Sequence, residues 1–292
     1  MLAAMAALDL LDRVAEIAGA RGARRVARIQ SLWGGYGEIV RVALDDGVAP
    51  TAIVKHVQPP PAKRDTVSDA RKRRSYDVEA RFYRDVAPRC DDRCRVARLY
   101  GADVEPGHWL FVLEDLDAAG FVDRHDDAPP AALDGCLAWL AAFHARFLGE
   151  TFEGLWPIGT YWHLDTRRDE LAAIRDRSLR ERADELDARL QRARFQTLLH
   201  GDPKEANFCF GQDRVAAVDF QYTGRGCAMR DVAYLLHGRG DVTRQLDAYF
   251  DHLRPLLARD AEAIEAEWRE LYDVARLDFE RFLAGWRPGY FG

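Results

Sequence analysis

The stretch Leu198–Tyr234 constrains the fold and chemistry of this 292-residue chain more than any other segment. It contains two short apolar runs, Leu198–Leu199 and Val215–Val218, and a group of polar side chains follows each of them. An apolar run that ends at an aspartate indicates a buried strand that delivers a carboxylate to the mouth of a cleft. We therefore expect the chemistry of the protein at the ends of these two strands.

The polar groups after the two runs contain Asp202, Asn207 and Asp219. Two carboxylates with an Asn between them suit phosphoryl transfer from a nucleotide. One carboxylate orients the attacking hydroxyl and accepts its proton, while the Asn and the other Asp hold Mg²⁺ against the phosphates. Carboxylate and amide oxygens are hard donors, which Mg²⁺ prefers.

The spacing of these residues resembles the catalytic loop of the protein-kinase-like fold, H-x-D-x-x-x-x-N, which a metal-binding Asp follows about a dozen residues later. The Gly in HGD and the wording VDFQYTGRG and RDVAYLL resemble the small-molecule branch, the aminoglycoside phosphotransferase and choline kinase superfamily. The ecdysteroid-kinase-like (CHK-kinase-like) group is the most similar. The resemblance implies that Asp202 is the catalytic base or orienter and that Asn207 and Asp219 bind Mg²⁺. It also places Lys204 near the transferring γ-phosphoryl group of ATP, while His200 and Asp231 brace the loop.

The N-terminal part of the chain reads as a helix followed by a small antiparallel sheet. Helical spacing of apolar residues predicts a helix over the first twenty residues, and alternation predicts strands at residues 25–33, 39–44 and 51–55. The first turn contains three glycines, Gly34, Gly35 and Gly37. A glycine-rich hairpin tip lets backbone N–H groups approach phosphate oxygens, so we expect these glycines to bind the nucleotide.

Lys55 ends the third strand and is one of only four lysines among 42 basic residues. Arg and Lys are not interchangeable where a compact charge must approach phosphate, so a retained Lys is informative. A following helix, predicted to run to about residue 87, puts Tyr76, Glu79, Tyr83 and Val86 on one face. Burying Glu79 there is costly unless it meets a cation. The resemblance implies that Lys55 contacts the α and β phosphates and that Glu79 positions it.

Two more strands, at residues 96–104 and 108–113, complete a predicted lobe of five strands. The resemblance makes the next segment the linker between two lobes, and it implies that the backbone of Glu114 and Leu116 binds the adenine edge. We therefore expect an α+β, bilobal protein-kinase-like fold. Residues 1–115 would form the small lobe, with an antiparallel sheet, one main helix and an N-terminal helix, and residues 116–292 the larger, mostly helical lobe.

Helical periodicity dominates after residue 130. His144 lies on an apolar helix face, where a buried, hydrogen-bonded residue is the expected interpretation. The charge-rich stretch at residues 167–194 predicts a solvated helix. Tyr161 and Trp162, in an irregular segment, belong either to the core or to the wall of a substrate pocket.

Bulk properties exclude several classes of protein. A net charge of −6 disfavours nucleic acid as the main partner, and no apolar run approaches the ~20 residues that cross a membrane. The five cysteines form no zinc-like pair of CxxC motifs, which indicates free thiols. The apolar N-terminus is interrupted by acidic residues and does not resemble a signal peptide. We expect a cytoplasmic monomer or homodimer.

Together these features predict an ATP- and Mg²⁺-dependent O-phosphotransferase that acts on a small hydroxylated molecule. Three alternatives remain open. A protein kinase would need an activation loop, but only twelve residues separate Asp219 from Asp231. A catalytically silent nucleotide- or metabolite-binding module need not keep the whole set of Lys55, Glu79, Asp202, Asn207 and Asp219. A metal-assisted hydrolase built on His200, Asp202 and Asp219 would leave Lys55 and Glu79 unexplained.

Overall fold

The computed structural model describes residues 2–60 and 66–286, without the side chains of residues 2–9 and 33. The chain forms two compact units. The first unit consists of Met1–Arg89 and Val96–Val122, and the second consists of Cys90–Arg95 and Asp123–Gly292. These units are defined by contacts within the chain and do not test where one kinase-like lobe ends and the other begins. The expected lobe border after residue 115 therefore remains a prediction.

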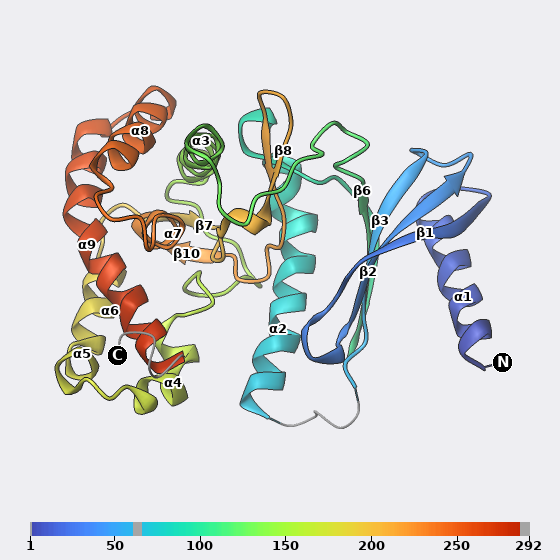
Figure 1. Cartoon of the computed structure of the whole chain (residues 1–292), viewed down its shortest axis with the longest axis horizontal. Coiled ribbons are helices and arrows are strands. Elements are labelled where there is room, and N and C mark those ends of the chain that lie inside the picture. The colour runs from blue at the N-terminus through green and yellow to red at the C-terminus, as the bar shows by residue number, and fades with distance from the viewer. Residues whose placement is uncertain (1, 61–65, 287–292) are drawn as a thin grey trace. The chain divides into compact units, whose positions relative to one another are not determined.

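The first unit is an antiparallel sheet with helices on both faces (Figure 1). Its strands follow the order β1-β2-β3-β6-β5. In chain order its main elements are α1 (Leu2–Ile17), β1 (Gly22–Ser31), β2 (Gly37–Asp45), β3 (Thr51–Val57), α2 (Val67–Arg81), β5 (Leu99–Glu105) and β6 (His108–Glu114). The five-stranded sheet, the N-terminal helix and the main helix agree with the prediction.

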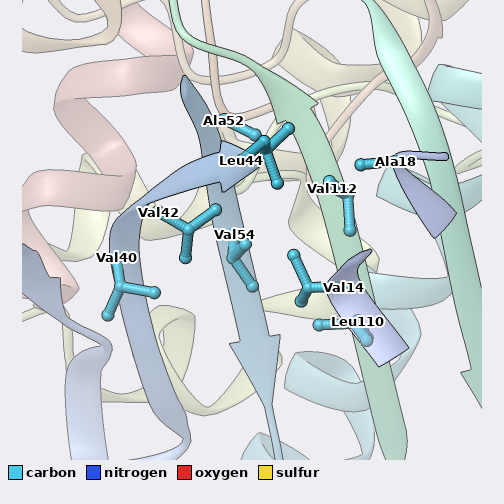
Figure 2. Close-up of a cluster of buried hydrophobic side chains, with 9 residues drawn as sticks. All are labelled: Val14, Ala18, Val40, Val42, Leu44, Ala52, Val54, Leu110 and Val112. Atoms are coloured by element: carbon cyan, nitrogen blue, oxygen red, sulfur yellow. The ribbon is translucent and has the colours of Figure 1, made fainter. Parts of the chain in front are cut away.

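One face of this sheet packs against α1. Nine buried side chains form this core: Val14, Ala18, Val40, Val42, Leu44, Ala52, Val54, Leu110 and Val112 (Figure 2). Because side chains alternate along a strand, the residue after Val54 points to the opposite face. That residue is Lys55, which pairs with Ile39 of β2 and Phe111 of β6 in the middle of the sheet.

The opposite face packs against α2. The ring of Tyr76 lies 5.4 Å from that of Trp109, and the ring of Tyr83 lies 6.3 Å from that of Phe111. Tyr76, Glu79, Tyr83 and Val86 are all buried, as their spacing predicted. The α-helix ends at Arg81, earlier than predicted, and continues as a π-helical turn, η3 (Phe82–Val86).

The second unit is mostly helical. Its helices of six or more residues are α3 (Pro130–Arg146), α4 (Arg168–Ala173), α6 (Ala183–Gln191), α7 (Met229–Leu235), α8 (Thr243–Leu253) and α9 (Ala261–Trp286). α3 packs against α8, while α9 packs against α4, α6 and α7. Its short strands are β7 (Thr197–Leu199), β8 (Phe208–Phe210), β9 (Val215–Ala217) and β10 (Gly224–Gly226). Both apolar runs of the motif stretch are thus strands, as predicted.

Two predictions about secondary structure were wrong in detail. The predicted strand at residues 96–104 divides into β4 (Arg95–Val96) and β5. The predicted solvated helix at residues 167–194 is three short helices, α4, α5 (Arg177–Glu181) and α6. Part of α6 faces inward, because Leu186, Asp187 and Leu190 are buried. Asp187 pairs with the buried Arg230, a partner that a periodicity argument does not reveal.

Among the helices in the described part of the chain, none is both long and apolar enough to cross a membrane.

Candidate active site

Asp202 lies in the loop after β7, where three side chains hold its carboxylate. The Tyr234 hydroxyl donates to Oδ1 at 2.9 Å, and the Asn207 amide donates to Oδ2 at 3.2 Å. Lys204 Nζ lies 3.4 Å from Oδ2. The Asp202 side chain is 11% exposed, so one edge of a largely buried carboxylate still faces open space.

The surroundings of Asp202 bring the pKa of its carboxyl group close to neutral pH. Burial raises its pKa, Lys204 and the Tyr234 hydroxyl lower it, and the nearby Asp219 carboxylate raises it, with a net value of about 6. Burial lowers the pKa of Lys204, but Asp202 and Asp219 outweigh it and the net shift is upward. A carboxylate with such a pKa is suited to accept a proton near neutral pH.

Asp231 braces the catalytic loop from the N-terminal part of α7. Its carboxylate accepts hydrogen bonds from the backbone N–H groups of His200, at 2.7 Å, and Gly201, at 3.0 Å. His144 Nε2 lies 3.2 Å from the same carboxylate, and His144 Nδ1 lies 2.8 Å from the Tyr249 hydroxyl. His144 is thus the buried, hydrogen-bonded residue that the sequence predicted, and it supports the loop through Asp231.

His200 and Gly201 fix the shape of the loop. His200 Nε2 lies 3.1 Å from the Val218 carbonyl, which only accepts, while His200 Nδ1 accepts from the Asp202 N–H at 3.3 Å. Burial lowers the pKa of His200, which favours this neutral form. Gly201 has φ 86°, and a Cβ there would lie 2.1 Å from the Tyr222 carbonyl oxygen. Only glycine fits this position.

Asn207 and Asp219 come from neighbouring backbone segments, since Val218 N–H donates to the Asn207 carbonyl at 2.9 Å. The Asn207 Nδ2 group donates to Asp202, so its Oδ1 is the atom that would bind the predicted metal ion. Asp219 has φ 70°, a conformation that non-glycine residues rarely adopt and that often marks a functional position. Mg²⁺ is usually held by one or two protein carboxylates and completes its shell with phosphates and water. The donor set fits that ion.

In the first unit, Lys55 and Glu79 form a buried ion pair. Lys55 Nζ lies 2.8 and 2.7 Å from the two carboxylate oxygens of Glu79. Lys55 is 5% exposed and Glu79 is 1% exposed. The contact that the sequence predicted is present, and because the pair is buried, each partner requires the other. Whether Lys55 contacts phosphate remains a prediction.

The three predicted phosphate-loop glycines all have positive φ: 72° at Gly34, 78° at Gly35 and 141° at Gly37. A Cβ at Gly37 would lie 2.0 Å from the His56 carbonyl oxygen, so the hairpin requires glycine there. Close packing against β3 is therefore a sufficient reason for glycine at position 37, without any contact to phosphate. Phosphate binding by the other two remains a prediction.

The predicted adenine-binding segment follows β6. The Glu114 N–H donates to the Arg98 carbonyl at 2.8 Å, and the Leu116 carbonyl accepts from the Phe121 N–H at 2.9 Å. Between them, the buried Asp115 carboxylate accepts from Arg41 Nε at 2.7 Å and from the Thr51 hydroxyl at 2.8 Å. The Asp115 side chain therefore anchors this segment to β2 and β3, whereas adenine binding by Glu114 and Leu116 remains a prediction.

Two site residues escaped the sequence analysis. Tyr234 donates its hydroxyl to Asp202, and the Gln221 amide donates to Asp219 Oδ1 at 2.6 Å. Tyr234 stands three residues after Asp231, so the two side chains lie on the same face of a helix. Since Asp231 is expected to brace the loop, this spacing could have predicted that Tyr234 also lies near it. No comparable signal marks Gln221.

The chain matches the model of the phosphotransferase enzyme family over residues 28–284. The match covers most of the chain, and the protein belongs to this family. A search of curated proteins found no match.

Solved structures share the fold at low sequence identity. An amicoumacin kinase in complex with AMP-PNP, Ca²⁺ and Ami is 14% identical, with a TM-score of 0.54, and the match covers 88% of this chain and 79% of that one. A choline/ethanolamine kinase family protein from Mesorhizobium loti is 14% identical, with a TM-score of 0.53 and coverage of 98% and 87%. A choline kinase from Streptococcus pneumoniae is 15% identical, with a TM-score of 0.50 and coverage of 90% and 92%.

These matches confirm the predicted superfamily and the predicted kinase-like fold, with an antiparallel-sheet lobe and a helical lobe. The closer similarity to the ecdysteroid-kinase-like group remains a prediction.

Proposed function

We propose that the protein transfers the γ-phosphoryl group of ATP to a hydroxyl group of a small molecule, in a reaction that requires Mg²⁺. The observation that supports this most is the Asp202 cluster: a carboxylate with a pKa of about 6, held by Tyr234 beside Lys204, Asn207 and Asp219. Orienting and charge-neutralising groups of this kind are what phosphoryl transfer requires.

Each residue has a distinct role in this proposal. Asp202 orients the acceptor hydroxyl and accepts its proton as the new bond forms. Lys204 offsets negative charge on the group in transfer, and Lys55, held by Glu79, contacts the α and β phosphates. Asn207 and Asp219 hold Mg²⁺, which supplies neutralising charge on the phosphate oxygens when bound. The expected cytoplasmic location, and the monomeric or homodimeric state, remain predictions.

The test is ADP formation from Mg–ATP across a panel of amino alcohols, sugars, sterols, aromatic alcohols and aminoglycosides, with Asp202→Ala beside the unaltered protein. We expect acceptor-dependent turnover that falls by about 10²–10⁴-fold in the variant, the usual contribution of a general base. Nucleotide binding should persist. Asp213→Ala is the matched control, because Asp213 is an exposed acid in the same stretch.

Near-normal turnover in Asp202→Ala would overturn the role of Asp202. No turnover with any acceptor, together with a melting temperature raised by Mg–ATP, would instead favour a nucleotide-binding module without catalysis.

A further inference from the structure

A cavity of about 440 Å³ opens beside the catalytic loop of the second unit. Four of its lining residues are Tyr, Phe or Trp, and we name these four the aromatic wall: Tyr161, Tyr234, Phe279 and Trp286. The ring centroids of Tyr234 and Phe279 lie 4.7 Å apart, and those of Tyr161 and Tyr234 lie 5.6 Å apart. Tyr161, Tyr234 and Phe279 thus pack as one group of rings, and together with Trp286 they give the cavity an aromatic lining.

The aromatic wall is attached to the catalytic loop. The Tyr161 N–H donates to the Gly201 carbonyl at 3.1 Å, and the Tyr234 hydroxyl donates to Asp202. Lys204 lines the same cavity and lies 3.4 Å from Asp202. A molecule that stacks on the wall therefore has its polar end next to the proposed base.

The carboxylates of the lining already have a cationic partner. Arg239 donates to both Asp127 and Glu205, and these two are the carboxylates among the lining residues in the described part. Lys204 is in turn paired with Asp202. A polycationic acceptor would have to compete with Arg239 for its partners, and such competition weakens binding.

A second arginine, which is not among the residues that line the cavity, lies over two of the four rings of the wall. The Arg167 guanidinium lies 5.0 Å from the Trp286 ring and 5.7 Å from the Tyr161 ring. It is 4% exposed, and it is fixed by a bond from Nε to the Tyr161 carbonyl at 2.6 Å and by Glu170. Glu170 offsets its charge, but the guanidinium still occupies these rings, and a second cation on them would be repelled at short range.

We infer, on the basis of the proposed phosphotransfer, that the acceptor is an uncharged alcohol with an apolar ring that stacks on the aromatic wall. In the reaction, the acceptor oxygen bonds to the γ-phosphorus of ATP, and the bond from that phosphorus to the bridging oxygen of ADP breaks. The hydroxyl proton passes to Asp202 and then to water.

The experiment compares two acceptors of the same shape that differ in charge, 2-(4-tert-butylphenyl)ethanol and 2-[4-(trimethylammonio)phenyl]ethanol. ADP formation is measured with the full chain and Mg–ATP, and kanamycin and choline represent other cationic acceptors. We expect kcat/KM to be about tenfold or more higher for the neutral alcohol, because the cation meets rings that Arg167 already occupies. Equal or better turnover of the cationic partner, or turnover of kanamycin or choline alone, would overturn the inference.

Binding without ATP separates this inference from the proposed function. The melting temperature is measured with each member of the pair in protein free of nucleotide and Mg²⁺. Greater stabilisation by the neutral alcohol supports the acceptor class even where no ADP forms. Stabilisation by the cation alone, or by neither compound, contradicts it.

A variant pair tests the wall itself. Trp286 is 46% exposed, so Trp286→Ala should leave the fold intact. We expect this variant to raise KM for the neutral alcohol by about tenfold, with a smaller effect on kcat, because it removes a stacking surface without altering the contacts of Asp202. Trp286→Phe, which keeps a ring, should restore most of the affinity. An unchanged KM in Trp286→Ala would contradict stacking on this wall.

Discussion

Two buried groups of charged side chains in the second unit share the short helix α7, and they differ in how their charges balance. The first, the arginine network, contains two carboxylates and two guanidinium groups: Asp187, Asp278, Arg230 and Arg281. Arg230 lies 2.7 Å from Asp187 and 2.9 Å from Asp278, and all four residues are at most 5% exposed. The second is the Asp202 cluster, in which Asp202 and Asp219 share one nearby lysine, Lys204.

The pKa values follow this balance. Burial raises the pKa of Asp187, but His163 and Arg230 outweigh it and hold that pKa well below its usual range. In the Asp202 cluster, burial and Asp219 raise the pKa of Asp202 by more than Lys204 and Tyr234 lower it, and the pKa rises to about 6. The arginine network thus contains its own counter-charges, whereas the Asp202 cluster has an excess of carboxylate that a bound cation would balance. One helix serves both groups, since Arg230, Asp231 and Tyr234 all belong to α7.

The largest effect should come from breaking the arginine network. Arg230→Met leaves Asp187 and Asp278 buried without the cation that they share. Removing one partner of a buried ion pair costs about 3–5 kcal/mol of the free energy of unfolding. Urea unfolding at pH 7 would measure it.

The matched control is Arg225→Met, at an exposed arginine of β10. Its free energy of unfolding should change by about 0.5 kcal/mol or less. A similar small change in Arg230→Met would show that the arginine network does not stabilise the second unit.

Removing the charge of Asp202 should raise the free energy of unfolding, whereas removing the charge of Arg230 should lower it. The pKa of Asp202 is raised in the folded protein above its unfolded value of 3.8, so ionised Asp202 destabilises the fold once the pH exceeds that unfolded value. The penalty grows as pH rises and is complete above pH 6. Asp202→Asn should therefore stabilise the metal-free protein at pH 8 by up to about 3 kcal/mol.

The pH dependence is the specific signature of this effect. At pH 5 most folded molecules carry a protonated Asp202, so the stabilisation by Asp202→Asn should be about half as large. Urea unfolding of both proteins with EDTA, at pH 8 and pH 5, would measure the difference. A variant less stable than the unaltered protein at pH 8 would contradict the idea that the Asp202 cluster carries excess negative charge.

Sequence alone predicted the parts of the site that are local in the chain. Asp202, Asn207 and Asp219 stand within eighteen residues of one another, near the ends of short strands. The spacing of the motif is therefore enough to predict that their side chains lie close together. Glu79 was found because a charge on an apolar helix face is costly unless it has a partner, and the scarcity of lysine pointed to Lys55.

The arginine network and the aromatic wall could not be predicted in the same way. Arg230 contacts Asp187 across 43 residues and Asp278 across 48 residues. No periodicity links positions so far apart, because tertiary packing alone brings α6, α7 and α9 together. For the same reason periodicity predicts solvated charged residues in α6, and it does not decide whether Tyr161 belongs to the core or to a pocket wall.

The smallest predicted effect concerns the one hydroxyl by which α7 contacts Asp202. Tyr234→Phe keeps the ring and removes the hydrogen bond to Asp202 Oδ1, and a hydrogen bond to a charged group contributes about 1.5–3 kcal/mol to the free energy of unfolding. That bond also lowers the pKa of Asp202, so its loss should move the acid limb of kcat/KM to higher pH. Tyr272→Phe, which removes a hydroxyl from a buried tyrosine of α9, should leave the limb in place. If both variants keep the pH profile of the unaltered protein, Tyr234 belongs to the packing of α7 alone, and the two charged groups on this helix are less different than their pKa values indicate.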